Sequence, residues 1–262
     1  MRIAPPFTLA DDVLEKVPCK ATGMVSSGIP SLDGVLGGGL TSGRVHEVYS
    51  AEADDGAAAI GFAMALASNL SEGGQRPALW LRSASAMRFG GVLQAQGWAE
   101  FGGAPEIALF GMVPDGLGLL RAAVDALRCP ALSVVIAESW GAMRELDLTA
   151  SRRLSLAAEK SGVTLLLLRL NAISAPSAAQ TRWQVASAPS RALPGHAPGA
   201  PVFNITLLRQ KSGPCGMDWR LEWDRDRCIF RETPLSGLVL SVPGDRPAAV
   251  GTNWQRLGKS AA

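Results

Sequence analysis

Apolar segments of two kinds alternate along the chain from Val45 to about Asn171. Short runs that carry little or no internal charge predict strands, at 45–50, 77–82, 106–111, 131–139 and 163–170. Longer stretches rich in alanine or with apolar residues at helical spacing predict helices, at 57–74, 86–96, 115–128 and 148–162. Asp115 and Asp147 stand where the last two of these helices begin, and Asp115 is a natural N-cap.

Strands that are apolar on both sides favour a parallel sheet, because only helices on both faces of such a sheet hide both sides of each strand. The connections between these strands should be right-handed. Farther along, segments 202–213, 217–226 and 227–232 predict an antiparallel meander at the sheet edge, with its last turn at 224–227. The expected fold class is therefore α/β, with a mostly parallel sheet, helices on both faces and an antiparallel edge hairpin.

Three segments fall outside this regular pattern. Residues 1–44 are broken by prolines and predict an amino-terminal arm with at most one short helix, and the glycine-rich stretch from Leu32 to Arg44 predicts a loop. The stretch from Ser174 to Pro201 is rich in Ser, Ala, Pro and Gly and predicts a long mobile loop. We therefore expect a core over 45–234 and a carboxyl-terminal tail over 235–262.

Composition narrows the class of protein further. Hydrophobic residues make up 47% of the 262 residues and charged residues 18%, which provides for a core and excludes disorder over most of the length. No apolar run is long enough for a bilayer and no signal-peptide pattern is visible, so we expect a cytoplasmic protein with no membrane partner. The net charge of +2 is too small to indicate a nucleic-acid partner by itself.

Cysteine and histidine contribute little candidate chemistry. The four cysteines show no C-x-x-C pair, which argues against a zinc site and a disulfide framework; they are Cys19, Cys129, Cys215 and Cys228. We interpret His46 as a structural residue at a strand entry and His196 as an exposed loop residue. No metal and no cofactor are expected.

The segment from Thr22 to Ala67 resembles the opening of the RecA-like ATPase core. Ser31-Leu32-Asp33, Gly37-Gly38-Gly39-Leu40 and Gly43-Arg44 match its lead-in, and Glu47-Val48-Tyr49 matches its first strand. The order of helices and strands to about residue 170 fits as well. The resemblance implies that a phosphate-binding loop follows this strand.

The phosphate loop is where the resemblance fails. A working loop needs a lysine for the phosphate charge and a hydroxyl for Mg²⁺, in the pattern G-x-x-x-x-G-K-[ST]. The chain reads SAEADDGAAA over 50–59, with no lysine and with Asp54 and Asp55 in its place. Carboxylates repel phosphates, and phosphoryl transfer depends on cationic stabilisation. We interpret five positions as a vestigial loop: Ser50, Asp54, Asp55, Gly56 and Ala57.

Two further ATPase positions have changed. Glu138 stands where an active relative holds magnesium with an aspartate, so it marks a vestigial metal position. The carboxylate that polarises water should fall near Arg82 or Ser83, and neither can act as a base. The sequence therefore predicts a protein that is not an enzyme.

Three stretches of the chain are together similar to the ImuA family, which are inducible-mutagenesis proteins related to the SulA family. These stretches are the degenerate loop, Ser177 to Ser190 and Leu207 to Asp224. This resemblance implies a non-catalytic accessory protein of a DNA-damage-inducible (SOS) translesion-synthesis mutasome. It implies contacts with an ImuB-like polymerase homologue and an error-prone DNA polymerase. Three further contacts are candidates: RecA, weakly bound single-stranded DNA and a second copy of the chain.

Two alternatives stay open at this point. The first is a divergent RecA-like ATPase that takes a lysine or arginine from a neighbouring subunit, which predicts stabilisation by nucleotide. The second is a SulA-like inhibitor of cell division, which predicts binding to the division GTPase.

Several residues are candidates for contact with DNA or a partner: Arg182, Trp183, Arg191, Arg209 and Lys211. We place Arg182 and Trp183 in the loop after the last apolar strand, where an arginine beside an aromatic ring suits single-stranded nucleic acid. The alternative is that Trp183 folds back on the core and that Arg182 is solvated.

Other tryptophans also allow two interpretations. Trp219 and Trp223 share one face of a strand, either packed in the core or exposed to a partner. Trp140 either plugs the abandoned nucleotide site or stacks on a ligand. In the tail, Leu238, Trp254 and Arg256 form a candidate docking segment.

Overall fold

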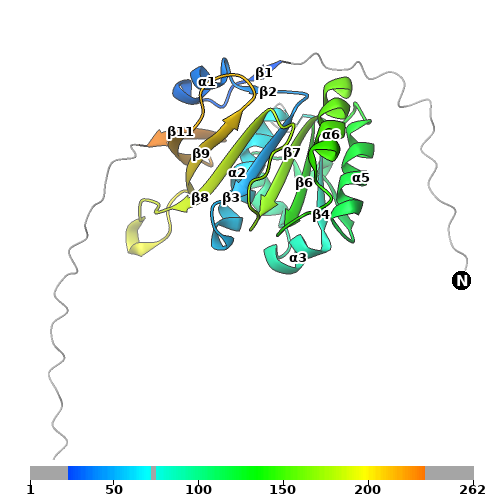
Figure 1. Ribbon diagram of the computed structural model, residues 1–262. Coiled ribbons are helices and arrows are strands. Elements are labelled where there is room, and N and C mark those ends of the chain that lie inside the picture. The colour runs from blue at the N-terminus through cyan, green and yellow to red at the C-terminus, as the bar shows by residue number, and fades with distance from the viewer. Residues whose placement is uncertain (1–22, 72–74, 234–262) are drawn as a thin grey trace, which may run out of the picture.

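A computed structural model describes residues 23–71 and 75–233 of the chain (Figure 1). Several sequence expectations lie outside these residues: the first part of the arm with Cys19, the helix stop at Gly73-Gly74, and the tail with Leu238, Trp254 and Arg256. The side chain of His196 is likewise outside the description.

The centre of the fold is a nine-stranded sheet in the order β11-β10-β9-β8-β3-β7-β6-β4-β5. The strands are β3 (Val45–Ser50), β4 (Ala78–Ser83), β5 (Leu109–Val113), β6 (Val134–Trp140), β7 (Thr164–Leu170), β8 (Thr181–Ala188), β9 (Val202–Gln210), β10 (Met217–Asp224) and β11 (Ile229–Thr233). From β5 to β8 all neighbours are parallel, and from β8 to β11 they are antiparallel. The predicted α/β class, with its antiparallel edge, is confirmed.

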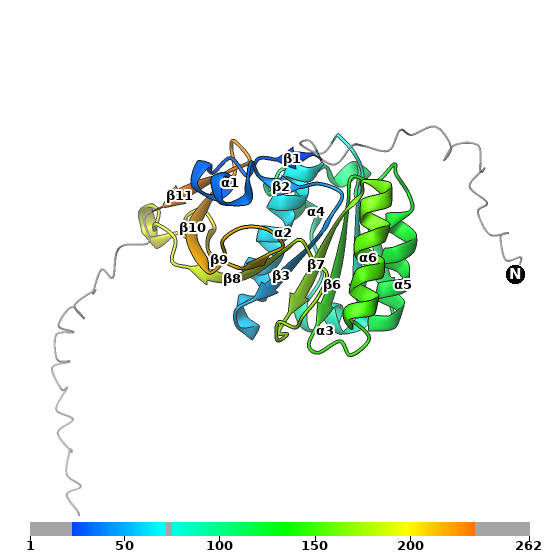
Figure 2. The same ribbon diagram turned by 45° about the horizontal axis from the view of Figure 1, so that its top comes forward.

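Helices cover both faces of the sheet (Figures 1 and 2). They are α1 (Pro30–Leu36), α2 (Gly56–Leu70), α3 (Ala84–Gly90), α4 (Ala95–Glu100), α5 (Gly116–Leu127) and α6 (Leu148–Ser161). One apolar core lies between the sheet and α1, α2 and α4, and the other lies under α5 and α6. Strands β6 and β7 are buried along nearly all their length, which explains why apolar and polar residues do not alternate along them.

The predicted core tryptophans pack on the α2 face of the antiparallel strands. Trp219 and Trp223 are both buried, as the core interpretation required. The ring of Trp183 lies 6.2 Å from that of Trp219 and 6.3 Å from that of Phe62 on α2. Aromatic packing therefore holds the antiparallel edge to the helix that follows the phosphate-loop position.

The prediction of a loop over 174–201 was wrong in its centre, because β8 occupies Thr181–Ala188. This strand pairs with β3 on one side and β9 on the other, so its backbone groups are satisfied in the sheet interior. Because β8 is rich in Ser and Ala, its sequence shows no clear pattern of apolar and polar residues from which a strand could be predicted. Only Asn171 to Gln180 connects β7 to it.

Two other expectations need correction. The helix predicted over 86–96 is divided into α3 and α4, since Gly91 has a φ of +69° that an α-helix does not allow. The glycine-rich lead-in is not all loop: it includes the end of α1 and β2 (Leu40–Thr41), which pairs with β1 (Met24–Val25). Leu32 and Leu40 are buried in the core beside α2, so residues 23–44 pack onto the domain.

Among the described residues, no helix is long and apolar enough to cross a membrane.

Candidate functional site

The loop between β3 and α2, where the resemblance places bound phosphates, is closed by one of its own carboxylates. Residues Ala53–Asp55 form a short 3₁₀ turn. The Asp55 Oδ1 atom accepts hydrogen bonds from the Ser187 amide (2.7 Å) and hydroxyl (2.8 Å), and Oδ2 accepts one from the Glu52 amide (3.2 Å). The aspartate that replaces positive charge in this loop therefore ties the loop to β8.

Three backbone N–H groups of this loop already donate within the protein. The Ala51 amide donates to a carbonyl of β8 (2.8 Å), the Asp55 amide to the Glu52 carbonyl (3.2 Å), and the Gly56 amide to the Ala53 carbonyl. A phosphate loop works by directing such amides at its ligand. Here a phosphate would have to displace protein acceptors and approach Asp54, which is exposed beside them.

The other loop residues and Trp140 fit the same interpretation. Ser50 is buried and its hydroxyl accepts a hydrogen bond from the Asn171 amide (2.9 Å), while Ala57 is exposed. A Cβ atom added to Gly56 would lie 3.5 Å from the Trp140 ring, which stacks on Phe89 at 5.4 Å. The Trp140 ring thus packs against the first turn of α2, as a plug would.

Glu138, which we interpret from the sequence as a vestigial metal position, is held in a buried ion pair. Glu138 on β6 is completely buried and stands in register with Arg82 on β4. Arg82 donates from Nη2 to Oε1 (2.7 Å) and from Nε to Oε2 (2.8 Å), and Trp80 Nε1 also donates to Oε2 (2.8 Å). A metal ion here would have to compete with a guanidinium that already matches the charge of Glu138.

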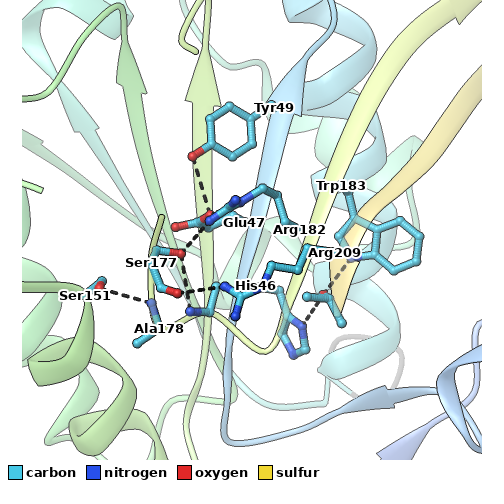
Figure 3. A network of polar contacts seen from close by, with 11 residues as sticks. His46, Glu47, Tyr49, Ser151, Ser177, Ala178, Arg182, Trp183 and Arg209 are labelled. Carbon is cyan, nitrogen blue, oxygen red and sulfur yellow. Dashed lines mark hydrogen bonds and ion pairs between the residues drawn. The ribbon is translucent and has the colours of Figure 1, made fainter. Parts of the chain in front are cut away.

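A second buried ion pair lies on the other face of the sheet (Figure 3). Arg182 on β8 is in register with Glu47 on β3, and its Nε donates to Glu47 Oε2 (2.7 Å). The Tyr49 hydroxyl approaches the same oxygen at 3.4 Å. Burial, followed by the charge of Glu47, raises the pKa of Tyr49, so the phenol stays protonated and can donate.

This second pair fixes the connection from β7 to β8. Arg182 Nη2 donates to the Ser177 hydroxyl (2.8 Å), and Arg209 Nη1 donates to the Ser177 carbonyl (3.0 Å). The Ala178 amide donates to the hydroxyl of Ser151 on α6 (3.1 Å), as Figure 3 shows. The segment 171–180 is therefore held against the sheet by side chains of β8, β9 and α6.

Some polar atoms near this pair are left without a partner. Glu47 Oε1, Ser139 Oγ and Arg169 Nε are buried and make no hydrogen bond within the described part of the chain. The Arg169 guanidinium lies 5.7 Å from the centre of the Tyr49 ring, in cation–π geometry. Sequence reasoning missed this network, although Glu47 carried a signal: a carboxylate within a strand expected to be buried.

The prediction that Arg182 and Trp183 contact DNA or a partner from a loop was wrong. Both lie in β8, where Arg182 is 8% exposed and Trp183 is 1% exposed. Trp183 belongs to the core, as its alternative interpretation held, whereas Arg182 is paired and not solvated. Segment 171–180 contains no lysine or arginine, so it brings no cation to a phosphate.

The three remaining contact candidates are exposed but do not form one patch. Arg209 and Lys211 lie near the amino-terminal end of β8, whereas Arg191 follows its carboxyl-terminal end. The eight residues of β8 span about 25 Å at the usual rise of a strand. Contact with single-stranded DNA stays a prediction for two separate places.

His46 is a satisfied structural residue, as predicted. Its Nε2 lies 2.8 Å from the Thr41 carbonyl, so Nε2 carries the proton and donates. Its Nδ1 then accepts from the Thr181 hydroxyl (2.7 Å), which in turn accepts from Trp183 Nε1 (2.8 Å). Complete burial lowers the pKa of His46 to about 4.

No cluster of His, Cys, Asp and Glu side chains that could hold a metal ion occurs within residues 23–71 and 75–233. In the same residues Cys129, Cys215 and Cys228 are free thiols.

The fold and the site together define a class: an α/β protein with a mostly parallel sheet, in which Asp55 ties the β3–α2 loop to β8 and the buried Glu138 is paired with an arginine. No protein-family model matches the chain. It is 31% identical over 216 residues to Protein ImuA from each of two strains of Caulobacter vibrioides, a match that covers 77% of this chain and 84% of the relative. The chain belongs to the ImuA family.

Proposed function

We propose that the chain is a non-catalytic accessory protein of DNA-damage-inducible mutagenesis. It acts through protein contacts in translesion synthesis, beside an ImuB-like polymerase homologue and an error-prone DNA polymerase. Membership of the ImuA family supports the process. The closed phosphate-loop position supports the absence of catalysis.

The observation that carries the proposal is the joint loss of three working parts. The amides of Ala51, Asp55 and Gly56 donate to the protein itself, and Asp55 bridges the loop to β8. Glu138, at the metal position, is held by Arg82 from the position of the catalytic base. Phosphoryl transfer depends on positioning and electrostatic stabilisation, so a site without these parts has no means to accelerate it.

The same geometry disfavours an ATPase completed by a neighbouring subunit. A lysine or arginine supplied by a neighbour would bring positive charge, but it would not release the amides of Ala51, Asp55 and Gly56. It would also leave the Glu138 carboxylate bound to Arg82. Binding of a neighbouring subunit would therefore have to be accompanied by two separate rearrangements, one of the loop and one of the Arg82–Glu138 pair.

Thermal unfolding with and without 5 mM Mg-ATP tests the catalytic question. A ligand present at about 100 times its Kd would stabilise the fold by about 2.7 kcal/mol. We expect no change in the melting temperature, alone or with the proposed polymerase partners present. A reproducible increase would contradict the proposal and favour the ATPase alternative.

A complementation experiment tests the function in cells. Ala57 is exposed on the first turn of α2, so Ala57→Phe obstructs the phosphate position without disturbing the core. We expect this variant to restore damage-induced mutation to a deletion strain as well as the original chain does. Selective loss of mutagenesis by a folded variant would indicate that the site is used.

Affinity capture from damaged cells tests the partners. The proposal expects the ImuB-like protein and the error-prone polymerase to be recovered with the chain. Recovery of the division GTPase in their place would favour the SulA-like alternative.

A further inference from the structure

Helices α5 and α6 lie side by side over one face of the sheet (Figure 2). Side chains of both helices line an open groove of about 1250 Å³. The wall from α5 presents Leu117, Arg121, Val124 and Arg128, which are successive positions of one helical stripe. Apolar and basic side chains thus alternate along this wall from one turn to the next.

The wall from α6 has the same spacing, with Thr149, Arg153, Leu156 and Lys160. Helix α5 connects β5 to β6, with β4 between them in the sheet, and α6 connects the neighbouring strands β6 and β7. Because all these strands are parallel, the two helices run in the same direction. The two stripes therefore progress together along the groove.

The groove exposes apolar side chains on both helices. Leu156 is 67% exposed and Leu117 is 42% exposed, although the other faces of both helices are buried against the sheet. Each exposed apolar side chain gives up the free energy that burial would provide. Exposed apolar side chains gathered in one groove beside charged ones are typical of an interaction site.

Two arginines give the groove its electrostatic character. Arg121 and Arg153 are exposed, line facing walls and form no ion pair within the described part of the chain. An exposed guanidinium between apolar neighbours is well suited to a bidentate bond with a carboxylate.

Three carboxylates also line the groove and do not meet this demand. Asp125 pairs with Arg128 at 3.1 Å, and Asp147 accepts the Ala150 amide at 2.6 Å as the N-cap of α6. Glu145 lies beside Gly116, where α5 begins. The central arginines therefore remain open to an acidic partner.

We propose that the α5–α6 groove is the docking site for an amphipathic helix of a partner protein, in which glutamate or aspartate alternates with leucine-like residues. Such a helix repeats its side chains every third or fourth residue, which matches the spacing of the side chains on both walls. A nucleic-acid backbone would meet Arg121 and Arg153 but would leave Leu117, Val124 and Leu156 uncovered. The proposal does not depend on the function proposed above.

Binding of synthetic peptides to the full chain, followed by fluorescence anisotropy, tests the proposal. The probe is a labelled amphipathic helix of about 15 residues, long enough to span α6 at the usual helical rise. Its glutamates lie between leucines at helical spacing, and a second peptide has lysine in place of every glutamate. A single-stranded oligonucleotide serves as competitor.

The decisive variant is the double charge reversal Arg121→Glu with Arg153→Glu. Its matched control is Arg152→Glu, which changes an exposed arginine of α6 outside the groove. We expect the groove variant to bind the acidic peptide at least about tenfold more weakly than the original chain, equivalent to about 1.4 kcal/mol. The control should change this affinity by less than about twofold. Circular dichroism and thermal unfolding verify that both variants fold.

A charge exchange makes the test stricter: the lysine peptide should bind the groove variant better than it binds the original chain. The proposal is overturned if the acidic peptide shows no saturable binding. It is also overturned if the groove variant and the control variant weaken binding of the acidic peptide equally. A third contradicting result is that the oligonucleotide displaces the peptide and that its own binding requires Arg121 and Arg153.

Discussion

Two buried arginine–glutamate pairs join neighbouring strands of the same sheet, and they differ in how completely they are satisfied. In the Arg82–Glu138 pair both carboxylate oxygens accept hydrogen bonds, and Trp80 provides a third donor. In the Glu47–Arg182 pair one carboxylate oxygen accepts from the arginine, while Glu47 Oε1 has no partner in the described part of the chain.

The difference shows two uses of one motif. The first pair connects β4 to β6 and is satisfied within the two strands. The second pair extends outward through Ser177 and fixes a connecting segment against the sheet. A buried charge pair is weak evidence for net stability, but the loss of one partner is costly because the other is left uncompensated.

The largest effect is expected at the fully satisfied pair. Glu138→Ala leaves the Arg82 guanidinium buried without a counter-charge and the Trp80 N–H without an acceptor. We expect the free energy of unfolding to fall by about 3–5 kcal/mol, measured by urea denaturation. The double variant Arg82→Met with Glu138→Leu should recover most of this loss; failure to recover it would mean that the pair itself is needed for the fold.

Acid should loosen the β3–β8 connection through protonation of His46. The pKa of His46 is lowered from 6.5 to about 4 in the folded chain, so the unfolded state binds the proton first as the pH falls. The stability that depends on neutral His46 is complete above pH 6.5 and decreases by at most about 1.4 kcal/mol per pH unit down to pH 4.

Stability measured across this range checks the prediction, with His46→Gln as the comparison. The variant should show a flatter dependence on pH. Hydrogen exchange should increase first in β3 and β8, because His46 and Thr181 are bonded across these strands. An equal slope in the two proteins would exclude His46 as the cause.

Glu47→Gln should have a smaller effect than Glu138→Ala. The amide keeps an acceptor for Arg182 but removes the charge, so we expect a loss of about 2 kcal/mol in unfolding free energy. Release of segment 171–180 then lets Arg182 reach water. Hydrogen exchange at Ala178 should therefore become faster in Glu47→Gln and remain unchanged in the folded double variant of the other pair.

The smallest effect is expected at Asp55→Ala. Asp55 satisfies the Glu52 amide and the amide and hydroxyl of Ser187, so its loss resembles the loss of a helix cap and should cost about 1 kcal/mol. Asp54→Ala, at the exposed neighbouring position, should change stability by less than about 0.5 kcal/mol. Thermal unfolding of the two variants compares a carboxylate that closes the loop with one that does not.

Much of the parallel half could be predicted from local pattern. The apolar runs at β6 and β7 and the capping aspartates of α5 and α6 are properties of short segments, and the Asp115 and Asp147 carboxylates do accept helix amides. Strand β8 escaped prediction because its burial comes from neighbours on both sides. The placement of Arg182 and Trp183 failed for the same reason.

By itself, the sequence determined the fold class and the absence of a lysine from residues 50–59, because both are written in consecutive residues. Only the tertiary structure decided that Arg82 binds Glu138, that Glu47 binds Arg182, and that Asp55 closes the loop on Ser187. Residues 47 and 182 are 135 positions apart and meet because β8 is placed beside β3. Strand order, which no local pattern encodes, decides which charges are brought together.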